Sequence, residues 1–262
     1  MPIGSIFKYI NKSNSSILKQ FLKNLYFSVY GIPDFHTHIR WRAVKRFIDF
    51  SSRSILDVGC GVGAFAFEIA SKIPSMRIIG IDTDEHAIEL ANSIKVTSRL
   101  DNVEFYYHDA NKPFPFPESS FDMVWLIDVL EHIQNDSAVI SDVSRILKRG
   151  GYVLVSVPTP NYPRFFGKDF HLEIGHIRDG YWLEDLARLL SKHNLSVISH
   201  TYYTWVPSAF MCGMFYRYLR KNKISFLLSP ILNTLSFLDI LWPVRNPKFS
   251  CSLLVKAQNR EK

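Results

Sequence analysis

The chain has 262 residues, of which 47% are hydrophobic and 21% are charged, which is typical of a globular protein of one or two domains. This composition excludes a disordered chain and a collagen-like repeat, and three cysteines are too few for a disulfide scaffold. No run of 18 apolar residues indicates a membrane span, and the first residues lack the apolar core of a signal peptide. We therefore expect a protein of the reducing cytoplasm.

Charge is distributed unevenly along the chain. Residues 1–53 hold nine Lys and Arg against two Asp, and residues 201–262 hold nine Lys and Arg against two acidic residues. Residues 54–200 hold thirteen basic and twenty acidic side chains. Two basic arms around an acidic middle favour an anionic partner, either a membrane surface or nucleic acid. The alternative is that two solvated helix faces are basic without any such partner.

Residues 1–52 are predicted to form a helical N-terminal arm or cap. Apolar side chains recur at helical spacing between residues 17 and 25, with Lys19 and Lys23 turned to the other side. A Gly-Ile-Pro break at 31–33 separates this helix from a second one, which we expect over residues 38–50.

Residues 53–203 are predicted to form a core in which strands and helices alternate. Short apolar runs indicate strands at 55–58, 77–81, 103–107, 123–127, 152–157 and 195–203, with helices at 64–72, 84–98, 135–148 and 180–192. Such alternation predicts an α/β fold with a doubly wound, mostly parallel sheet covered by helices on both faces. A seventh strand is expected within residues 250–262, after a helical insertion.

The predicted insertion, residues 204–249, carries six Lys and Arg and one Asp. Apolar residues recur every three to four positions over 224–242, interrupted by Pro230, and a basic cluster at 217–223 precedes them. This combination is typical of a segment that lies on anionic lipid, so peripheral membrane attachment is one hypothesis. The alternatives are a lid over the active site and a dimer surface, and an apolar lid could also admit a lipid-linked acceptor.

A glycine-rich loop lies between the first predicted strand and the following helix, with Asp57, Gly59, Gly61 and Gly63. Glycines allow a tight turn and a close approach of the backbone to a ligand. The spacing also fits dinucleotide-binding loops, and Asp82 after the second strand suits ribose hydroxyls in either setting. The loop alone therefore leaves an NAD-dependent oxidoreductase open.

Five motifs taken together are more specific. They are Ile55-Leu56-Asp57-Val58-Gly59-Cys60-Gly61-Val62-Gly63, Gly80-Ile81-Asp82-Thr83-Asp84, His108-Asp109-Ala110, Phe121-Asp122-Met123-Val124-Trp125 with Asp128-Val129-Leu130-Glu131-His132-Ile133, and Leu147-Lys148-Arg149-Gly150-Gly151-Tyr152. In order and spacing this set resembles the class I S-adenosylmethionine-dependent methyltransferases, in the small-molecule group that includes quinone O-methyltransferases. The resemblance covers about residues 53–200 and the final strand. It implies a seven-stranded Rossmann-like fold and S-adenosyl-L-methionine as cofactor, but it does not name the acceptor.

The resemblance also implies which residues bind the cofactor. The glycine loop would contact the methionine part, Asp57 its amino group, Asp82 the ribose, and Asp109 with Ala110 the adenine. The full expected set is Asp57, Gly59, Cys60, Gly61, Gly63, Asp82, Thr83, Asp109, Ala110, Ile127 and Asp128.

Three histidines are candidates for chemistry at the acceptor. His132 follows the fourth predicted strand, and its ordinary pKa suits a general base near neutral pH, although it could instead support the adjacent helix. His171 and His176 lie in the loop after the fifth strand, where ligands bind in open α/β sheets, unless both are satisfied structural imidazoles.

No metal site is expected from the sequence. Asp128, Glu131 and His132 are spaced like a metal-binding cluster in some quinone O-methyltransferases, but Leu130 stands where those relatives tend to have a further acidic residue. His36 and His38 form a lone H-x-H without cysteine partners, which does not indicate zinc.

The leading hypothesis is a methyltransferase that acts on a small-molecule or lipid-linked acceptor, at oxygen. An RNA-directed methyltransferase could use the basic arms, since aromatic and basic residues interleave at 7–27. We do not expect nucleic acid as a partner, because the chain has no recognisable RNA-binding module and Leu126-Ile127-Asp128-Val129 replaces the tetrapeptide of many base N-methyltransferases. A non-catalytic partner subunit is a further alternative.

Overall fold

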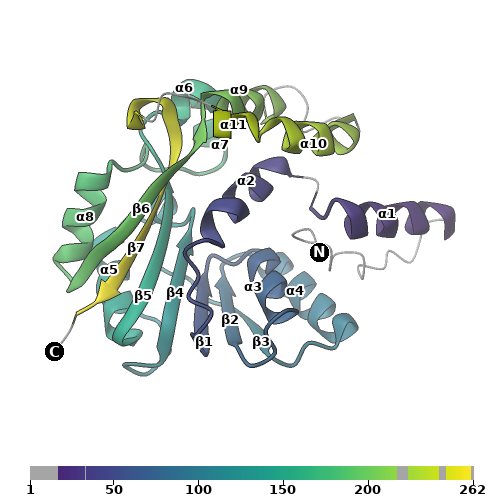
Figure 1. Ribbon diagram of the computed structural model, residues 1–262. Helices are drawn as coiled ribbons and strands as arrows, with labels where there is room; N and C mark the ends of the chain where they lie inside the picture. Colours follow the sequence, from purple (N-terminus) through teal and green to yellow (C-terminus); the bar gives the residue numbers. More distant parts are fainter. Residues whose placement is uncertain (1–16, 33, 217–223, 242–245, 261–262) are drawn as a thin grey trace.

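The computed structural model describes residues 17–32, 34–216, 224–241 and 246–260 (Figure 1). Its centre is a seven-stranded sheet in the order β3-β2-β1-β4-β5-β7-β6. The strands are β1 (Ser54–Val58), β2 (Arg77–Asp82), β3 (Val103–Tyr107), β4 (Phe121–Ile127), β5 (Leu147–Pro158), β6 (Leu195–Trp205) and β7 (Ser250–Asn259). Strands β1 to β5 are parallel, whereas β7 pairs antiparallel with both β5 and β6. The predicted doubly wound, mostly parallel sheet is therefore confirmed.

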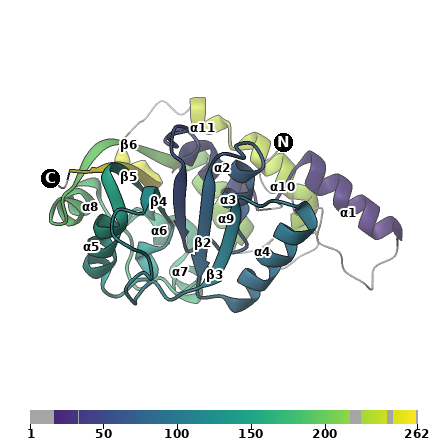
Figure 2. The same cartoon turned by 90° about the horizontal axis from the view of Figure 1, so that it is seen from below.

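Helices cover both faces of the sheet, as the near-continuous apolar strands predict. On one face, α3 (Ala64–Ala70) and α4 (Glu85–Ser98) contribute Phe67 and Ile94 to one buried cluster. On the other face, α5 (Asp136–Ile146) and α8 (Leu183–Ser191) contribute Val143 and Leu190 to a second cluster. Figure 2 shows these two helix pairs on opposite sides of the strands.

The strand order changes direction between β1 and β4. From β1 the chain winds outward to β2 and β3, and it then returns to place β4 on the other side of β1. The loops that follow β1 and β4 consequently diverge, and they leave a crevice at the carboxyl ends of these strands. Open α/β sheets bind their ligands in this crevice.

Two N-terminal helices precede the sheet, α1 (Ile17–Val29) and α2 (Phe35–Val44). The second helix begins earlier and ends earlier than the expected 38–50, so that sequence-based prediction of its bounds is wrong. Asp34 explains the start, because its carboxylate accepts a hydrogen bond from the backbone N–H of His36 at 3.2 Å, as an N-cap does.

The chain after β6 forms α9 (Val206–Met214), α10 (Ile224–Leu235) and α11 (Leu238–Leu241), with Pro230 inside α10. Helix α9 packs on α6 (Tyr162–Phe166), which follows β5 and precedes α7 (Lys168–Glu173). The inserted helices therefore lie at the carboxyl end of the sheet, from which β7 runs back antiparallel (Figure 1). The predicted basic cluster at 217–223 lies outside the described residues. None of the helices described is both long enough and apolar enough to span a bilayer.

Candidate active site

The glycine loop after β1 folds across the end of β2. The N–H groups of Gly59 and Cys60 donate to the carbonyl of Ile81 at 2.8 and 3.1 Å, and the N–H of Gly61 donates to Oδ2 of Asp82 at 2.7 Å. Gly59 has a φ of +69°, and a Cβ there would lie 2.5 Å from a methyl group of the loop after β4. The loop can approach this closely only because the residue is glycine.

A cavity of about 380 Å³ lies beside this loop, in the crevice between β1 and β4. Six of the eleven expected cofactor-binding residues line it, and these are Gly59, Asp82, Thr83, Asp109, Ala110 and Asp128. His132 lines the same cavity, together with Asn111, which the sequence analysis did not single out, and His108, which it named only as part of the His108-Asp109-Ala110 motif. A second cavity, of about 400 Å³ between α2 and β6, is lined by none of these residues.

The other five expected residues are not among those that line the cavity, and these are Asp57, Cys60, Gly61, Gly63 and Ile127. Gly63 instead lies against the ring of Phe105, which a Cβ would approach to 2.6 Å. Asp57 is 2% exposed at the end of β1, directly below the loop. Burial, and then the nearby Asp82 carboxylate, raise the pKa of Asp57 to about 8.

Asp128 joins the cavity to the N-terminal helices. Its carboxylate forms an ion pair with Arg40 of α2 and accepts a hydrogen bond from the hydroxyl of Ser156 at 2.6 Å. The hydroxyl of Tyr203 lies 2.6 Å from Ser156 and extends this network to β6. Burial alone would raise the pKa of Asp128, but the Arg40 guanidinium and the Ser156 hydroxyl bring it below its ordinary value. Sequence analysis did not single out Arg40, because a basic residue in a helix carries no local signal of a contact with a residue 88 positions away.

The three candidate histidines come together beyond the end of β4. His132 ends the 3-10 turn Leu130–His132, and its ring lies edge-on to that of His176, with centroids 4.8 Å apart. The Nδ1 atoms of His176 and His171 are 3.0 Å apart, and Nε2 of His171 lies 3.2 Å from a carboxylate oxygen of Asp179. Burial lowers the pKa of His176 to about 4 and also lowers that of His171, so both rings are neutral near pH 7.

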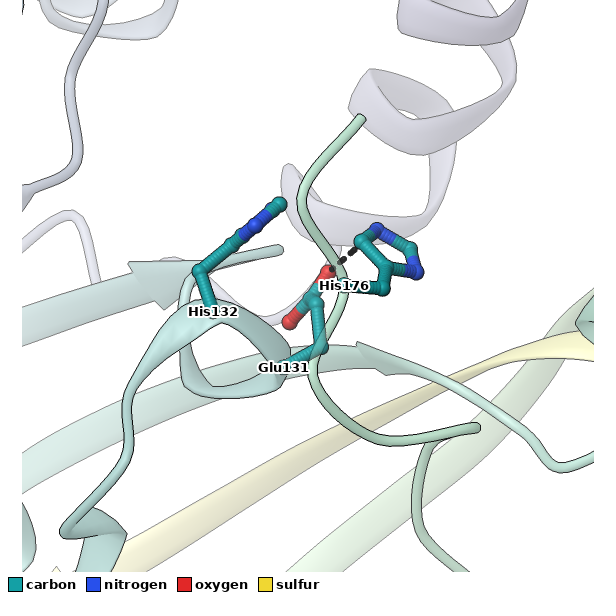
Figure 3. A group of neighbouring side chains, drawn as sticks. All are labelled: Glu131, His132 and His176. Carbon is teal, nitrogen blue, oxygen red and sulfur yellow. Dashed lines mark ion pairs between the residues drawn. The ribbon is translucent and has the colours of Figure 1, made fainter. Parts of the chain in front are cut away.

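Glu131 is the most unusual group of this cluster. Its side chain is fully buried, and neither carboxylate oxygen has a hydrogen-bond partner in the described part of the chain. Figure 3 shows the carboxylate between the rings of His132 and His176, with 3.9 Å from Oε1 to Nε2 of His176. Burial, and then the Asp128 carboxylate, hold the pKa of Glu131 well above its ordinary value.

Known proteins resemble this chain most clearly over the sheet. A family model described as a methyltransferase domain matches residues 49–193. A demethylmenaquinone methyltransferase from Lactococcus lactis subsp. lactis is 31% identical over 169 residues, which are 61% of this chain and 67% of that protein. The enzyme of the same name from Thermotoga maritima is 27% identical over 73% of this chain and 71% of its own length. A 27-O-demethylrifamycin SV methyltransferase from Amycolatopsis mediterranei is 35% identical over 40% of each chain.

Solved structures share the fold at low sequence identity. The [4+2]-cyclase SpnF aligns over 96% of this chain and 85% of its own, with a TM-score of 0.59 and 19% identity. A SAM-dependent methyltransferase from Methanosarcina mazei aligns over 84% of this chain and 97% of its own, with a TM-score of 0.55 and 19% identity. The family match decides between the two cofactors that the glycine loop left open. The chain belongs to the methyltransferase-domain family and is a class I S-adenosylmethionine-dependent methyltransferase.

Proposed function

We propose that this enzyme methylates an oxygen of a small, apolar acceptor of the quinone or phenol type. The observation that carries the proposal is one cavity that is lined both by Gly59 of the glycine loop with Asp82 and by Asp128 with His132. Relatives named as methyltransferases of demethylmenaquinone and of 27-O-demethylrifamycin support an acceptor of this class.

In the proposed site the residues position the cofactor and the acceptor and do not themselves react. The Asp82 carboxylate, fixed by the N–H of Gly61 at 2.7 Å and that of Asp84 at 2.9 Å, would hold the ribose hydroxyls. Asp109 and Ala110 would contact the adenine, and Asp57 below the loop would face the amino group. The bound S-adenosylmethionine supplies an electrophilic methyl group on a sulfonium. The chain aligns the acceptor oxygen with that carbon, which is the main contribution an enzyme makes to an in-line displacement.

The test is transfer of radiolabelled methyl from S-adenosylmethionine into a cell extract, followed by partition between water and an organic solvent. We expect label in the organic phase with the wild-type protein and none with Asp82→Ala, which removes the proposed ribose contact. The exposed change Glu89→Ala, on α4, serves as the matched control and should retain transfer. Label that enters only the aqueous phase would contradict an apolar acceptor.

Calorimetry addresses the cofactor separately. We expect S-adenosylhomocysteine to bind the wild-type protein with one site per chain and NADH not to bind. Saturation by NADH would refute the assignment of the cavity.

We further propose that the enzyme docks on an anionic membrane surface, from which an apolar acceptor can enter. Helices α1, α10 and α11 lie on the same side of the molecule (Figures 1 and 2). They present exposed large apolar side chains, which are Phe21, Leu22, Leu25, Val29, Ile231, Leu235, Leu238 and Leu241, and Tyr30 directly after α1 is also exposed. Apolar surface of this extent on a monomer marks an interaction site, and the basic arms match anionic lipid.

Co-sedimentation with vesicles tests the docking surface. We expect the wild-type protein to sediment with phosphatidylglycerol vesicles at low salt and less with phosphatidylcholine vesicles. Leu25→Glu with Leu241→Glu should reduce sedimentation, whereas Val96→Glu, an exposed apolar residue on α4, should not. Equal sedimentation of all three proteins would refute this surface, and a concentration-dependent dimer lost in the double variant would assign it to a second copy of the chain.

A further inference from the structure

A buried carboxylate without a partner requires an explanation. Glu131 is 0% exposed and neither oxygen accepts or donates a hydrogen bond among the described residues. Burial of such a group without compensation costs several kcal/mol, so native proteins almost always pair it with a donor or a cation. The nearest ring nitrogen, Nε2 of His176, is 3.9 Å away and too distant for a hydrogen bond.

The neighbouring histidines do not offer Glu131 a proton. Nδ1 of His132 lies 3.1 Å from the carbonyl oxygen of Gly175, which only accepts hydrogen bonds, so Nδ1 must carry the proton. In the neutral ring this leaves a lone pair on Nε2. The hydrogen bond to Gly175 also fixes the orientation of the imidazole.

The same reasoning applies to His176 through a second partner. Nε2 of His171 lies 3.2 Å from the carboxylate of Asp179 and therefore donates to it, which leaves a lone pair on Nδ1 of His171. Nδ1 of His176, at 3.0 Å from that lone pair, must then be the donor. The Nε2 atom of His176 keeps its own lone pair, and it is this atom that faces Glu131.

Side chains with potential ligand atoms from two distant segments thus lie close together. One potential ligand atom from each of Glu131, His132 and His176 lies within 4.8 Å of the others (Figure 3). We propose that Glu131, His132 and His176 bind a divalent transition-metal ion of the zinc class. Two imidazoles and one carboxylate are a ligand set that such ions take, with coordination positions left open. The hydrogen bonds to Gly175 and from His176 to His171 are the outer contacts that orient metal-bound imidazoles.

Binding requires a small contraction of the cluster. Ligand atoms about 2.0–2.2 Å from a zinc ion lie about 3.3 Å from one another, so the most widely spaced pair must approach by about 1.5 Å. His176 lies in the connection between α7 and α8, which is held to the turn after β4 by a hydrogen bond from the N–H of Ile177 to the carbonyl of Glu131 at 3.0 Å. The contraction would therefore come from rotation of the His176 and Glu131 side chains, with the backbone of both segments in place. Sequence analysis expected no metal because of Leu130, and it did not connect His176 with this cluster, since His176 is 44 positions away from His132.

The ion would lie at the wall of the cavity, since His132 is both a proposed ligand and a lining residue. An open coordination position there suits the acceptor hydroxyl oxygen. In the methyl transfer, that oxygen loses its proton to solvent water and forms the bond to the methyl carbon, while the departing sulfur keeps the electron pair of the broken bond. A metal-bound oxygen deprotonates more readily, so His132 would act as a ligand instead of the general base expected from the sequence. This catalytic role rests on the proposed function, whereas the binding of the metal does not.

The experiment is a titration of chelator-treated, full-length protein with Co²⁺, whose visible absorption reports its coordination. Zn²⁺ is then added to compete for the same site. We expect one Co²⁺ per chain, intense bands of a four- or five-coordinate site, and displacement by Zn²⁺. Glu131→Gln and His176→Ala should weaken binding by at least about 100-fold. Asp179→Asn, at an exposed residue, should weaken it by about 10-fold through the outer contact. His86→Ala, at an exposed histidine on α4, is the matched control and should bind as the wild type does.

Several outcomes would overturn the proposal. Less than one tenth of an equivalent of Co²⁺ or Zn²⁺ on the wild-type protein would do so, and so would unchanged binding by Glu131→Gln and His176→Ala. Circular dichroism of each variant shows whether it is folded, and Asp179→Asn gives an answer even if the two buried substitutions unfold the chain. The titration contains neither cofactor nor acceptor. Absence of metal binding would therefore not contradict the proposed methyl transfer, and absence of methyl transfer would not affect the metal titration.

Discussion

The buried carboxyl of Asp57 should make the stability of the fold depend on pH in a defined way. Its pKa is about 8 in the folded protein against an ordinary value of 3.8, because burial and the Asp82 carboxylate disfavour the ionised form. Between these two pKa values the folded chain holds a proton that the unfolded chain has released. The free energy of unfolding therefore falls by about 1.4 kcal/mol for each pH unit from this group, and the loss is complete above about pH 8.

The substitution Asp57→Asn removes this titration and keeps the size of the side chain. We expect the difference in free energy of unfolding between the variant and the wild type to grow in favour of the variant. The increase should be about 3 kcal/mol from pH 5.5 to pH 7.5. Contributions from all other titrating groups cancel in that difference when the folds are the same.

Urea denaturation followed by tryptophan fluorescence at four pH values measures the effect. Ile55→Val on the same strand is the matched control, since it removes one methyl group from a fully buried residue and titrates nothing. It should cost about 1 kcal/mol at every pH. A difference between Asp57→Asn and the wild type that changes by less than about 0.5 kcal/mol over this range would refute the reasoning.

Three further predictions concern the cavity. Binding of S-adenosylhomocysteine near pH 7 should release close to one proton from Asp57, seen by calorimetry in buffers of different ionisation enthalpy, and Asp57→Asn should release none. Gly59→Ala should destabilise the fold by more than Gly61→Ala in urea denaturation. Both glycines have a positive φ, but only a Cβ at Gly59 would meet a neighbouring atom within 4 Å. Equal losses of stability in the two variants would contradict the close packing of the loop. Asp128→Asn should cost about 2 kcal/mol, since it leaves the partly buried Arg40 without its carboxylate, and a cost below 0.5 kcal/mol would show that the ion pair is solvent-screened.

The sequence by itself determined the sheet and the position of the cofactor crevice. Apolar runs such as β4, which is buried at six of its seven positions, indicate strands because a strand covered on both faces has no polar side. Gly59 and Asp82 also follow directly from the sequence, because each stands where a strand ends and a loop begins, and the motif spacing is local. Both line the cavity.

Only the tertiary structure decided which distant residues meet there. Arg40 reaches Asp128 across 88 positions, and His176 reaches Glu131 across 45, through chain folding that no local periodicity encodes. The end of α2 is another example, since no Gly or Pro stands between Val44 and Phe50 to stop a helix, and yet the helix ends at Val44. Local pattern therefore specified the strands and the loops between them. Which side chains of those loops pair with one another depends on tertiary packing, because that packing is made of contacts between residues far apart in the sequence.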